Sequence, residues 1–301
     1  MSFAAEVKTE LCRGAISRRC CAMAECYGIL LYCNTFNSGE IRIITENDAF
    51  AQRLPQLLKK AFKLTFDRLP DGEGKHIFGI HDPAKLAAIQ QAFGGDPRDL
   101  ALHINFGNLE ENCCRSAFLR GAFLAGGSVT DPRKGYHLEL TTSHLSVSRE
   151  MLALMREMEL EPKAASRKGN AVIYFKQSDR IEDFLTTIGA PISAMEVMNA
   201  KLEKDLRGSV NRRINCDTAN LDKAVEAAFV QMEAIRRLEE RGELAGLPEK
   251  LREAAKLRAD HPEDTLAQLA QRCDPPITKS ALNHRLRKLV ELGKAEAEGE
   301  E

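Results

Sequence analysis

The chain contains no tryptophan, and aromatic residues make up only 6% of its 301 positions. It also lacks any apolar run approaching the roughly 20 residues that cross a bilayer, and no apolar stretch of signal-peptide length follows a cationic start. The formal net charge is −1, so affinity for nucleic acid would have to come from local basic patches. These absences predict a cytoplasmic protein with no membrane partner.

Motifs that carry common catalytic chemistry are also absent. The sequence has no glycine-rich phosphate loop, no H-E-x-x-H pair and no G-x-S-x-G elbow. Its seven histidines are scattered, and none can be matched with a nucleophile. We therefore expect no catalytic residues, no cofactor and no enzyme activity.

The nine cysteines are an odd number, which argues against a complete disulfide framework. None stands in the C-x2-C spacing of structural zinc sites. Cys20 and Cys21 recur as Cys113 and Cys114 inside a repeated helix, where small apolar residues are needed for packing. We expect buried free thiols of a reducing compartment, and no metal site.

The main feature that is present is a unit that occurs twice. Segment 20–37 (CCAMAECYGILLYCNTFN) aligns with segment 113–130 (CCRSAFLRGAFLAGGSVT), which places Gly28 on Gly121. A β-rich segment, an apolar helix, a short strand and a closing helix then follow in both. In the first copy they lie at 41–45, 54–66, 76–80 and up to 94; in the second they lie at 136–142, 151–160, 171–175 and up to 189. The pattern predicts an α+β fold: an αββαβα pseudo-dimer with copies at about 20–97 and 113–197, in one domain of residues 1–198.

The rest of the chain has a different character. Residues 199–217 predict a basic interdomain linker, in which Arg207, Arg212 and Arg213 either hold a DNA backbone or are simply solvated. A long helix is expected from about Asn220 to Arg241, because its apolar residues recur at helical spacing. It begins an all-α domain of residues 218–295, which is followed by an acidic tail at 296–301.

Two short helices near the end of this domain predict a helix-turn-helix. The first covers 265–273 and is ended by prolines; Thr278 is a good N-cap for the second. On the second helix Leu282, Leu286, Leu289 and Val290 form one apolar stripe, so the polar residues project from the other side. The expected DNA-binding residues of this helix are Lys279, Ser280, Asn283, His284, Arg285, Arg287 and Lys288. Arginine and asparagine recognise base edges and lysine neutralises phosphate, although a solvated basic face would look similar.

Segment 119–127 (LRGAFLAGG) resembles the signature helix of LAGLIDADG homing endonucleases. In that family two such helices pack side by side, and each carries a metal-binding acid near its end. Small residues at Ala117, Gly121 and Ala125 would permit the close packing. The motif places Cys33 and Gly126 where the acids should stand, and neither residue supplies the oxygen ligand that magnesium needs.

The degenerate repeat, the basic linker and the helix-turn-helix together resemble the WhiA regulators. Segments 1–12, 113–130, 207–221 and 283–288 carry the resemblance. It implies a nucleoid-associated transcriptional regulator of sporulation or cell division that binds double-stranded promoter DNA, lacks nuclease activity and acts with a protein co-regulator. An active homing-type endonuclease and an interaction scaffold with weak DNA binding remain the alternatives.

Arg42, His137 and Thr141 would lie on the sheet surface that binds DNA in the endonucleases, but Glu46 and Glu139 make that surface less favourable for phosphate.

Overall fold

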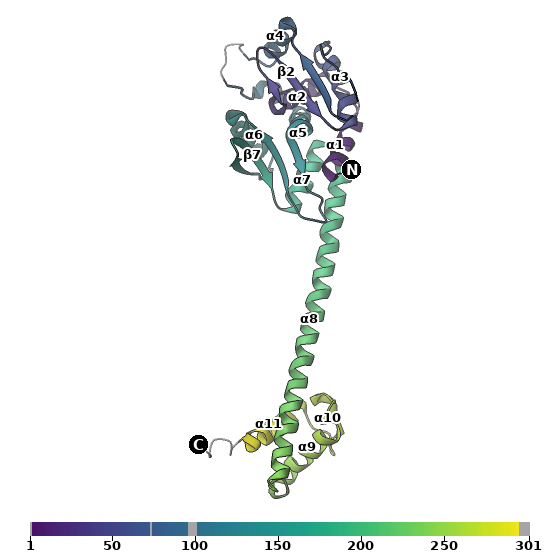
Figure 1. The fold of residues 1–301 in the computed structure, drawn as a ribbon, viewed down its shortest axis with the longest axis vertical. Coiled ribbons are helices and arrows are strands. Elements are labelled where there is room, and N and C mark those ends of the chain that lie inside the picture. The colour runs from purple at the N-terminus through teal and green to yellow at the C-terminus, as the bar shows by residue number, and fades with distance from the viewer. Residues whose placement is uncertain (1, 73, 96–100, 295–301) are drawn as a thin grey trace. The chain divides into compact units, whose positions relative to one another are not determined.

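A computed structural model describes residues 2–72, 74–95 and 101–294, and the chain divides into two compact units, 1–205 and 206–301 (Figure 1). The predicted acidic tail at 296–301 and residue 97, the expected end of the first copy, lie outside the described residues. In the described ranges, no helix combines the length and the apolar composition that a membrane crossing requires.

The N-terminal unit contains the two predicted copies. A first helix, α1 (Phe3–Arg13), precedes them, and the Ser2 hydroxyl caps it by accepting the Ala5 N–H at 3.3 Å. The first copy comprises α2 (Arg19–Tyr32), β1 (Thr35–Phe36), β2 (Ile41–Thr45), α3 (Asp48–Phe62), β3 (His76–Ile80) and α4 (Pro83–Ala92). A short 3-10 turn, η1 (Phe106–Leu109), leads into the second copy. That copy comprises α5 (Asn112–Gly126), β4 (Gly127–Val129), β5 (Leu138–Thr142), α6 (Leu145–Glu157), β6 (Lys163–Arg167), β7 (Asn170–Phe175) and α7 (Ser178–Ile188).

Each copy forms its own antiparallel sheet, in the order β1-β2-β3 and β4-β5-β7-β6 (Figure 1). The predicted αββαβα order is confirmed in the first copy, but the second has an additional strand, β6. Sequence reasoning missed β6 because it is a polar edge strand without the apolar alternation that marks a half-buried strand. In the first copy, an isolated antiparallel β-bridge between Arg68 and Gly79 occupies the position that the β6–β7 pairing has in the second copy.

Two helices begin earlier than predicted, at Asp48 and Leu145 rather than at residues 54 and 151. In α3 the Asn47 side chain accepts the Phe50 N–H at 2.9 Å and so fixes the start of the helix. Pro55 therefore lies inside α3, although proline more often stands in a first turn.

The centre of the N-terminal unit is the packing of α2 against α5. A Cβ added to Gly28 would stand 2.1 Å from the Phe118 carbonyl oxygen, and one added to Gly121 would stand 2.0 Å from that of Glu25. Only glycine permits this approach at either position, and the two contacts are related by the repeat. The predicted close packing of the two signature helices is confirmed.

A buried ion network joins α2, α3 and α5. Glu25, 1% exposed, accepts hydrogen bonds from Arg53 Nε at 2.6 Å and Nη2 at 3.0 Å, and from Arg120 Nε at 2.9 Å. Arg53 also donates to the carbonyl oxygens of Cys12 and Gly14, so nearly all of its donors are satisfied. The network contains two cations for one carboxylate. Because it is buried, removing the carboxylate would leave charged guanidinium groups without a counter-charge.

One helix, α8 (Pro191–Glu240), contains 50 residues and includes the whole segment predicted to be a linker. The expected helix start near Asn220 is therefore wrong. Gly208 and the asparagines suggested a break, but each costs only about 1 kcal/mol or less in a helix, and the leucine, lysine, glutamate and arginine around them favour it. The helix ends at Glu240, and Gly242, which was predicted to stop it, follows with a φ of 71° that suits the left-handed position after a helix.

The C-terminal unit is all-helical. A 3-10 turn, η2 (Leu244–Gly246), follows α8 and precedes α9 (Glu249–Asp260), α10 (Leu266–Arg272) and α11 (Lys279–Lys294). Its core is formed by Ile235, Leu238, Ala254, Ala255, Leu269, Ala270, Leu282, Leu286 and Leu289. This small core fixes α10 and α11 on α9 and on the last turns of α8.

Candidate nucleic-acid interface

Capping residues define where α10 and α11 begin. Thr265 and Gln268 form a reciprocal capping box at the start of α10. Thr278 caps α11, since its Oγ1 accepts the Ala281 N–H at 3.2 Å. Ile277 and the fully buried Leu282, the two residues of the predicted hydrophobic staple, both belong to the packed core of this unit. The predicted helix-turn-helix geometry is confirmed at these residues.

The outer face of α11 is polar and largely basic. Ser280, His284 and Arg287 are exposed, and at 3.6 residues per turn they lie within about 60° of one another around the helix. Half-buried Asn283 and exposed Lys288 stand on either side of them. Lys279 is also exposed, in the first turn of the helix, but it stands about 100° around α11 from Ser280, in line with the apolar stripe. Arg287 and Lys288 give this face positive charge, and exposed Glu291, one turn after Arg287, is the acidic residue on it.

Arg285 is the exception among the predicted residues. It lies about 160° around α11 from Arg287, and its side chain is only 19% exposed. Its Nη1 stands 4.0 Å from Glu253 Oε2 on α9. The prediction that Arg285 flanks the recognition face is wrong, because a position near the apolar stripe directs this side chain into the domain.

The three arginines of the predicted linker are exposed on α8. Helical geometry separates Arg207 from Arg212 by about 140° and Arg212 from Arg213 by about 100°. The three guanidinium groups therefore point in three directions. A single DNA backbone could contact Arg212 and Arg213, or one of them with Arg207, but not all three equally.

The ends of the two central helices are built without acids, as predicted. Gly126 is the last residue of α5, and a Cβ there would stand 2.7 Å from the Thr141 carbonyl oxygen and 2.9 Å from Tyr32 Cδ1. Cys33 follows α2, and its Sγ lies 3.2 Å from the Leu30 carbonyl oxygen and 3.1 Å from that of Thr35. Burial raises the pKa of Cys33 to about 12, so this thiol stays neutral. Within the described residues, the only group of three or more side chains that could hold a metal ion consists of cysteines, away from these helix ends.

On the sheet surface of the second copy the acidic Glu139 lies among basic residues, and exposed Lys163 stands on the same face. Glu139 lies 3.0 Å from His137 Nε2 and accepts a hydrogen bond from Arg167 at 3.1 Å. On the first sheet Arg42 is exposed, with Nη2 3.4 Å from the Thr35 hydroxyl.

The cysteines of the repeat are placed differently from our expectation. All nine are free thiols in the structure. Cys114 is buried as predicted, but Cys20 is exposed, and Cys21 and Cys113 are half-buried. Consequently they are not simply packing residues, and the structure brings all four together. The prediction considered spacing within one segment and so missed a cluster formed between segments.

The fold and these sites define a class of protein: a duplicated LAGLIDADG-like domain without acids at its central helix ends, followed by a helix-turn-helix domain. Family models of the WhiA LAGLIDADG-like domain and the WhiA C-terminal HTH domain match residues 115–207 and 210–293. The chain belongs to the WhiA family.

Similar proteins extend along nearly the whole chain. The "Probable cell division protein WhiA" of Alkaliphilus metalliredigens is 34% identical and that of Bacillus licheniformis 36%; the alignments cover 98% and 97% of this chain, and 98% and 96% of theirs. The crystal structure of full-length DUF199/WhiA from Thermatoga maritima matches with a TM-score of 0.61 at 23% identity, over 98% of this chain and 99% of that one. This structural likeness establishes the shared fold.

Proposed function

We propose that this protein is a DNA-binding transcriptional regulator that acts on cell-division or sporulation genes, resides on the nucleoid and has no nuclease activity. The observation that carries the proposal is the outer face of α11, where exposed Ser280, His284 and Arg287 project from a helix held by its cap and staple. A rigid helix with a polar outer face is the element that helix-turn-helix proteins insert into the major groove.

Roles for individual side chains follow from their chemistry. Arg287 and Asn283 suit guanine and adenine edges, because each can form two hydrogen bonds with its base. Lys288 at the edge of the face and Lys279 in the exposed first turn suit phosphates, and Arg212 and Arg213 add backbone contacts from α8. Because Arg285 is directed toward Glu253, we assign it no DNA contact. We assign the sheet surface around Glu139 to the binding of a protein co-regulator.

Arg287→Ala is expected to weaken binding to the target site by about 1–3 kcal/mol and to relax the base preference at one position, because a base contact is lost.

Lys288→Ala should weaken binding to all sequences alike. If the wild-type protein neutralises about five phosphates, its slope of log affinity against log salt is about −4 to −5, and Lys288→Ala should make this slope shallower by about 0.9. Fluorescence-anisotropy titrations over a salt series, with target and scrambled duplexes, measure both effects.

Matched controls come from α9 in the same unit. Arg252→Ala and Lys256→Ala remove the same charges from exposed positions off α11, and both should retain wild-type affinity within a factor of about two. If Arg287→Ala and Lys288→Ala bind like these controls, α11 is not the recognition helix.

Supercoiled plasmid containing a bound site should remain uncut when incubated with the protein and Mg²⁺ or Mn²⁺. The reason is chemical: neutral Cys33 and side-chain-free Gly126 offer no oxygen ligands at the helix ends. Gel electrophoresis with and without a chelator measures the result. Site-specific nicking that the chelator abolishes, and that co-purifies with the protein through successive columns, would restore the endonuclease alternative.

A further inference from the structure

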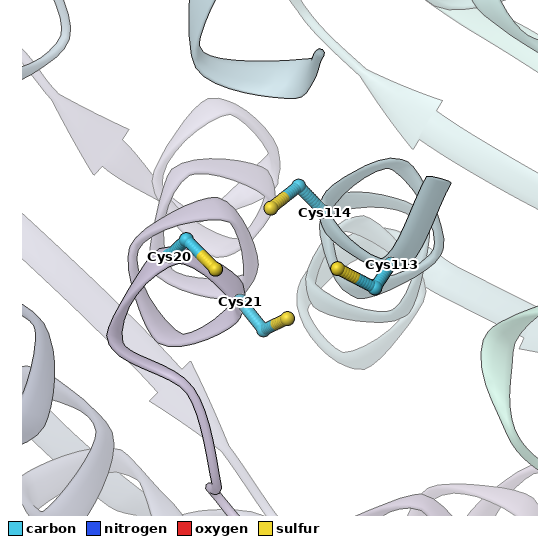
Figure 2. A group of neighbouring side chains, drawn as sticks. All are labelled: Cys20, Cys21, Cys113 and Cys114. Atoms are coloured by element: carbon cyan, nitrogen blue, oxygen red, sulfur yellow. The ribbon is translucent and has the colours of Figure 1, made fainter. Parts of the chain in front are cut away.

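The first turns of α2 and α5 bring four cysteines together from two segments of the chain. The Sγ atoms of Cys20, Cys21, Cys113 and Cys114 all lie within 4.8 Å of one another. Figure 2 shows the two pairs on facing helix ends, with their sulfur atoms directed toward the space between the helices. Nothing in the DNA-binding function described above requires this arrangement.

The fold places these cysteines with little freedom. In each helix the pair occupies the second and third residues, since α2 begins at Arg19 and α5 at Asn112. The mutual approach at Gly28 and Gly121 fixes the distance between the helices two turns further on. The repeat therefore produces a four-sulfur site by pseudo-symmetry, with two sulfurs from each copy.

The donor set suits one particular class of ion. Four thiolates arranged around a point are the ligands of tetrahedral zinc, in which Zn–S bonds of about 2.3 Å place the sulfurs about 3.8 Å apart. Sulfurs within 4.8 Å of one another need only a small adjustment to reach this geometry. Hard cations prefer oxygen ligands. An iron–sulfur cluster has iron and sulfide atoms between the thiolates and requires sulfurs farther apart than a single ion does.

Burial raises the pKa of Cys21 to about 11 and also raises that of Cys114, which disfavours thiolates, but the two helix starts and Arg18 act in the opposite direction. Neither N-cap residue, Arg18 or Glu111, provides a side-chain hydrogen bond, and neither helix has an acidic residue in its first turn. The uncapped N–H groups and the positive end of each helix dipole therefore lie in the same first turns as the cysteines. Arg18 also donates from Nη1 to Cys113 Sγ at 3.8 Å. These groups offset part of the excess charge of four thiolates around a divalent ion.

We propose that Cys20, Cys21, Cys113 and Cys114 bind one Zn²⁺ ion, which joins the two copies of the LAGLIDADG-like domain. Four Zn–S bonds form as the four thiols release their protons to solvent, and no oxidation takes place. The ion is structural, because all four tetrahedral positions are taken by protein ligands and none is open to substrate. It cross-links two helices whose sequence positions are separated by about one whole repeat.

The test uses the full-length protein, purified without exogenous metal under reducing conditions. Elemental analysis should find one zinc per chain. After removal of the zinc, a Co²⁺ titration should saturate at one ion per chain, with an intense thiolate-to-cobalt charge-transfer band and the visible bands of tetrahedral cobalt. The absence of a charge-transfer band would overturn the proposal, and this result does not depend on any variant.

Variants then locate the site. Cys20→Ser/Cys113→Ser removes one ligand from each copy and should abolish the one-to-one cobalt complex. Cys216→Ser, which changes an exposed cysteine outside the cluster, should bind cobalt like the wild type. Circular dichroism spectra of the double variant and of the metal-free wild type should agree, and a difference between them identifies a misfolded variant.

Three outcomes would contradict the single-ion assignment. These are equal cobalt binding by the double variant and the wild type, iron together with acid-labile sulfide in the purified protein, and a disulfide between the two cysteine pairs after rapid alkylation in cells. The absence of DNA binding would refute the proposed function while leaving this result unaffected.

Discussion

Gly121→Ala is expected to lower the free energy of unfolding of the N-terminal unit by about 3 kcal/mol. On an isolated helix the same change would be stabilising by about 1 kcal/mol, because alanine is the better helix former. Here the new Cβ would stand 2.0 Å from the Glu25 carbonyl oxygen and 3.0 Å from the Ile29 backbone nitrogen. Because these contacts are with backbone, no side chain can rotate away, and α5 must move off α2.

Urea unfolding measured by tyrosine fluorescence tests this prediction. All four tyrosines lie in the N-terminal unit and the chain has no tryptophan, so the signal reports on that unit. Gly28→Ala should behave alike, since its Cβ would stand 2.1 Å from the Phe118 carbonyl oxygen. Gly135→Ala is the matched control, because a Cβ there meets no atom within 4 Å. Unchanged stability of Gly121→Ala would show that the two helices are not packed this closely.

The second large effect is expected at the buried ion network. Glu25→Ala leaves the Arg53 side chain, 4% exposed, without a carboxylate, and should cost about 3–5 kcal/mol. The cost arises because a buried cation loses its counter-charge while its desolvation remains. The same tyrosine-monitored urea titration measures it.

A surface pair provides the comparison. Arg180→Ala breaks an ion pair with Glu161, whose side chain is 72% exposed, and should cost no more than about 1 kcal/mol. Replacing the whole network in Glu25→Leu/Arg53→Met/Arg120→Met should recover most of the loss, because apolar groups of similar volume need no pairing. If Glu25→Ala costs no more than Arg180→Ala, the network contributes nothing to stability.

Much of the fold could be predicted because the chain repeats itself. The match of Gly28 to Gly121 identifies the packed helices, and the residues after each copy repeat the strand and helix order. The same alignment locates Cys33 and Gly126 at the helix ends, where the structure has them. The start and the buried side of α11 were also predictable, since Thr278 and the leucine stripe specify them.

Other features were not predictable from local pattern. The strand β6 has no alternation, and α8 continues through Gly208 because neighbouring residues outweigh one weak helix former. Arg285 required the position of Glu253 on another helix. The cysteine cluster required two inferences to be combined: that Cys20-Cys21 and Cys113-Cys114 are repeat equivalents, and that their helices pack together. A search for metal-ligand spacing within one segment cannot find a site that is shared between copies.

A genome-wide occupancy map tests the central claim most directly. Crosslinking and immunoprecipitation of the tagged wild-type protein should give discrete sites that share a sequence motif, and Arg287→Ala at equal abundance should lose them while Arg252→Ala keeps them. A wild-type map without discrete sites, or an Arg287→Ala map identical to that of the wild type, would contradict DNA recognition by α11.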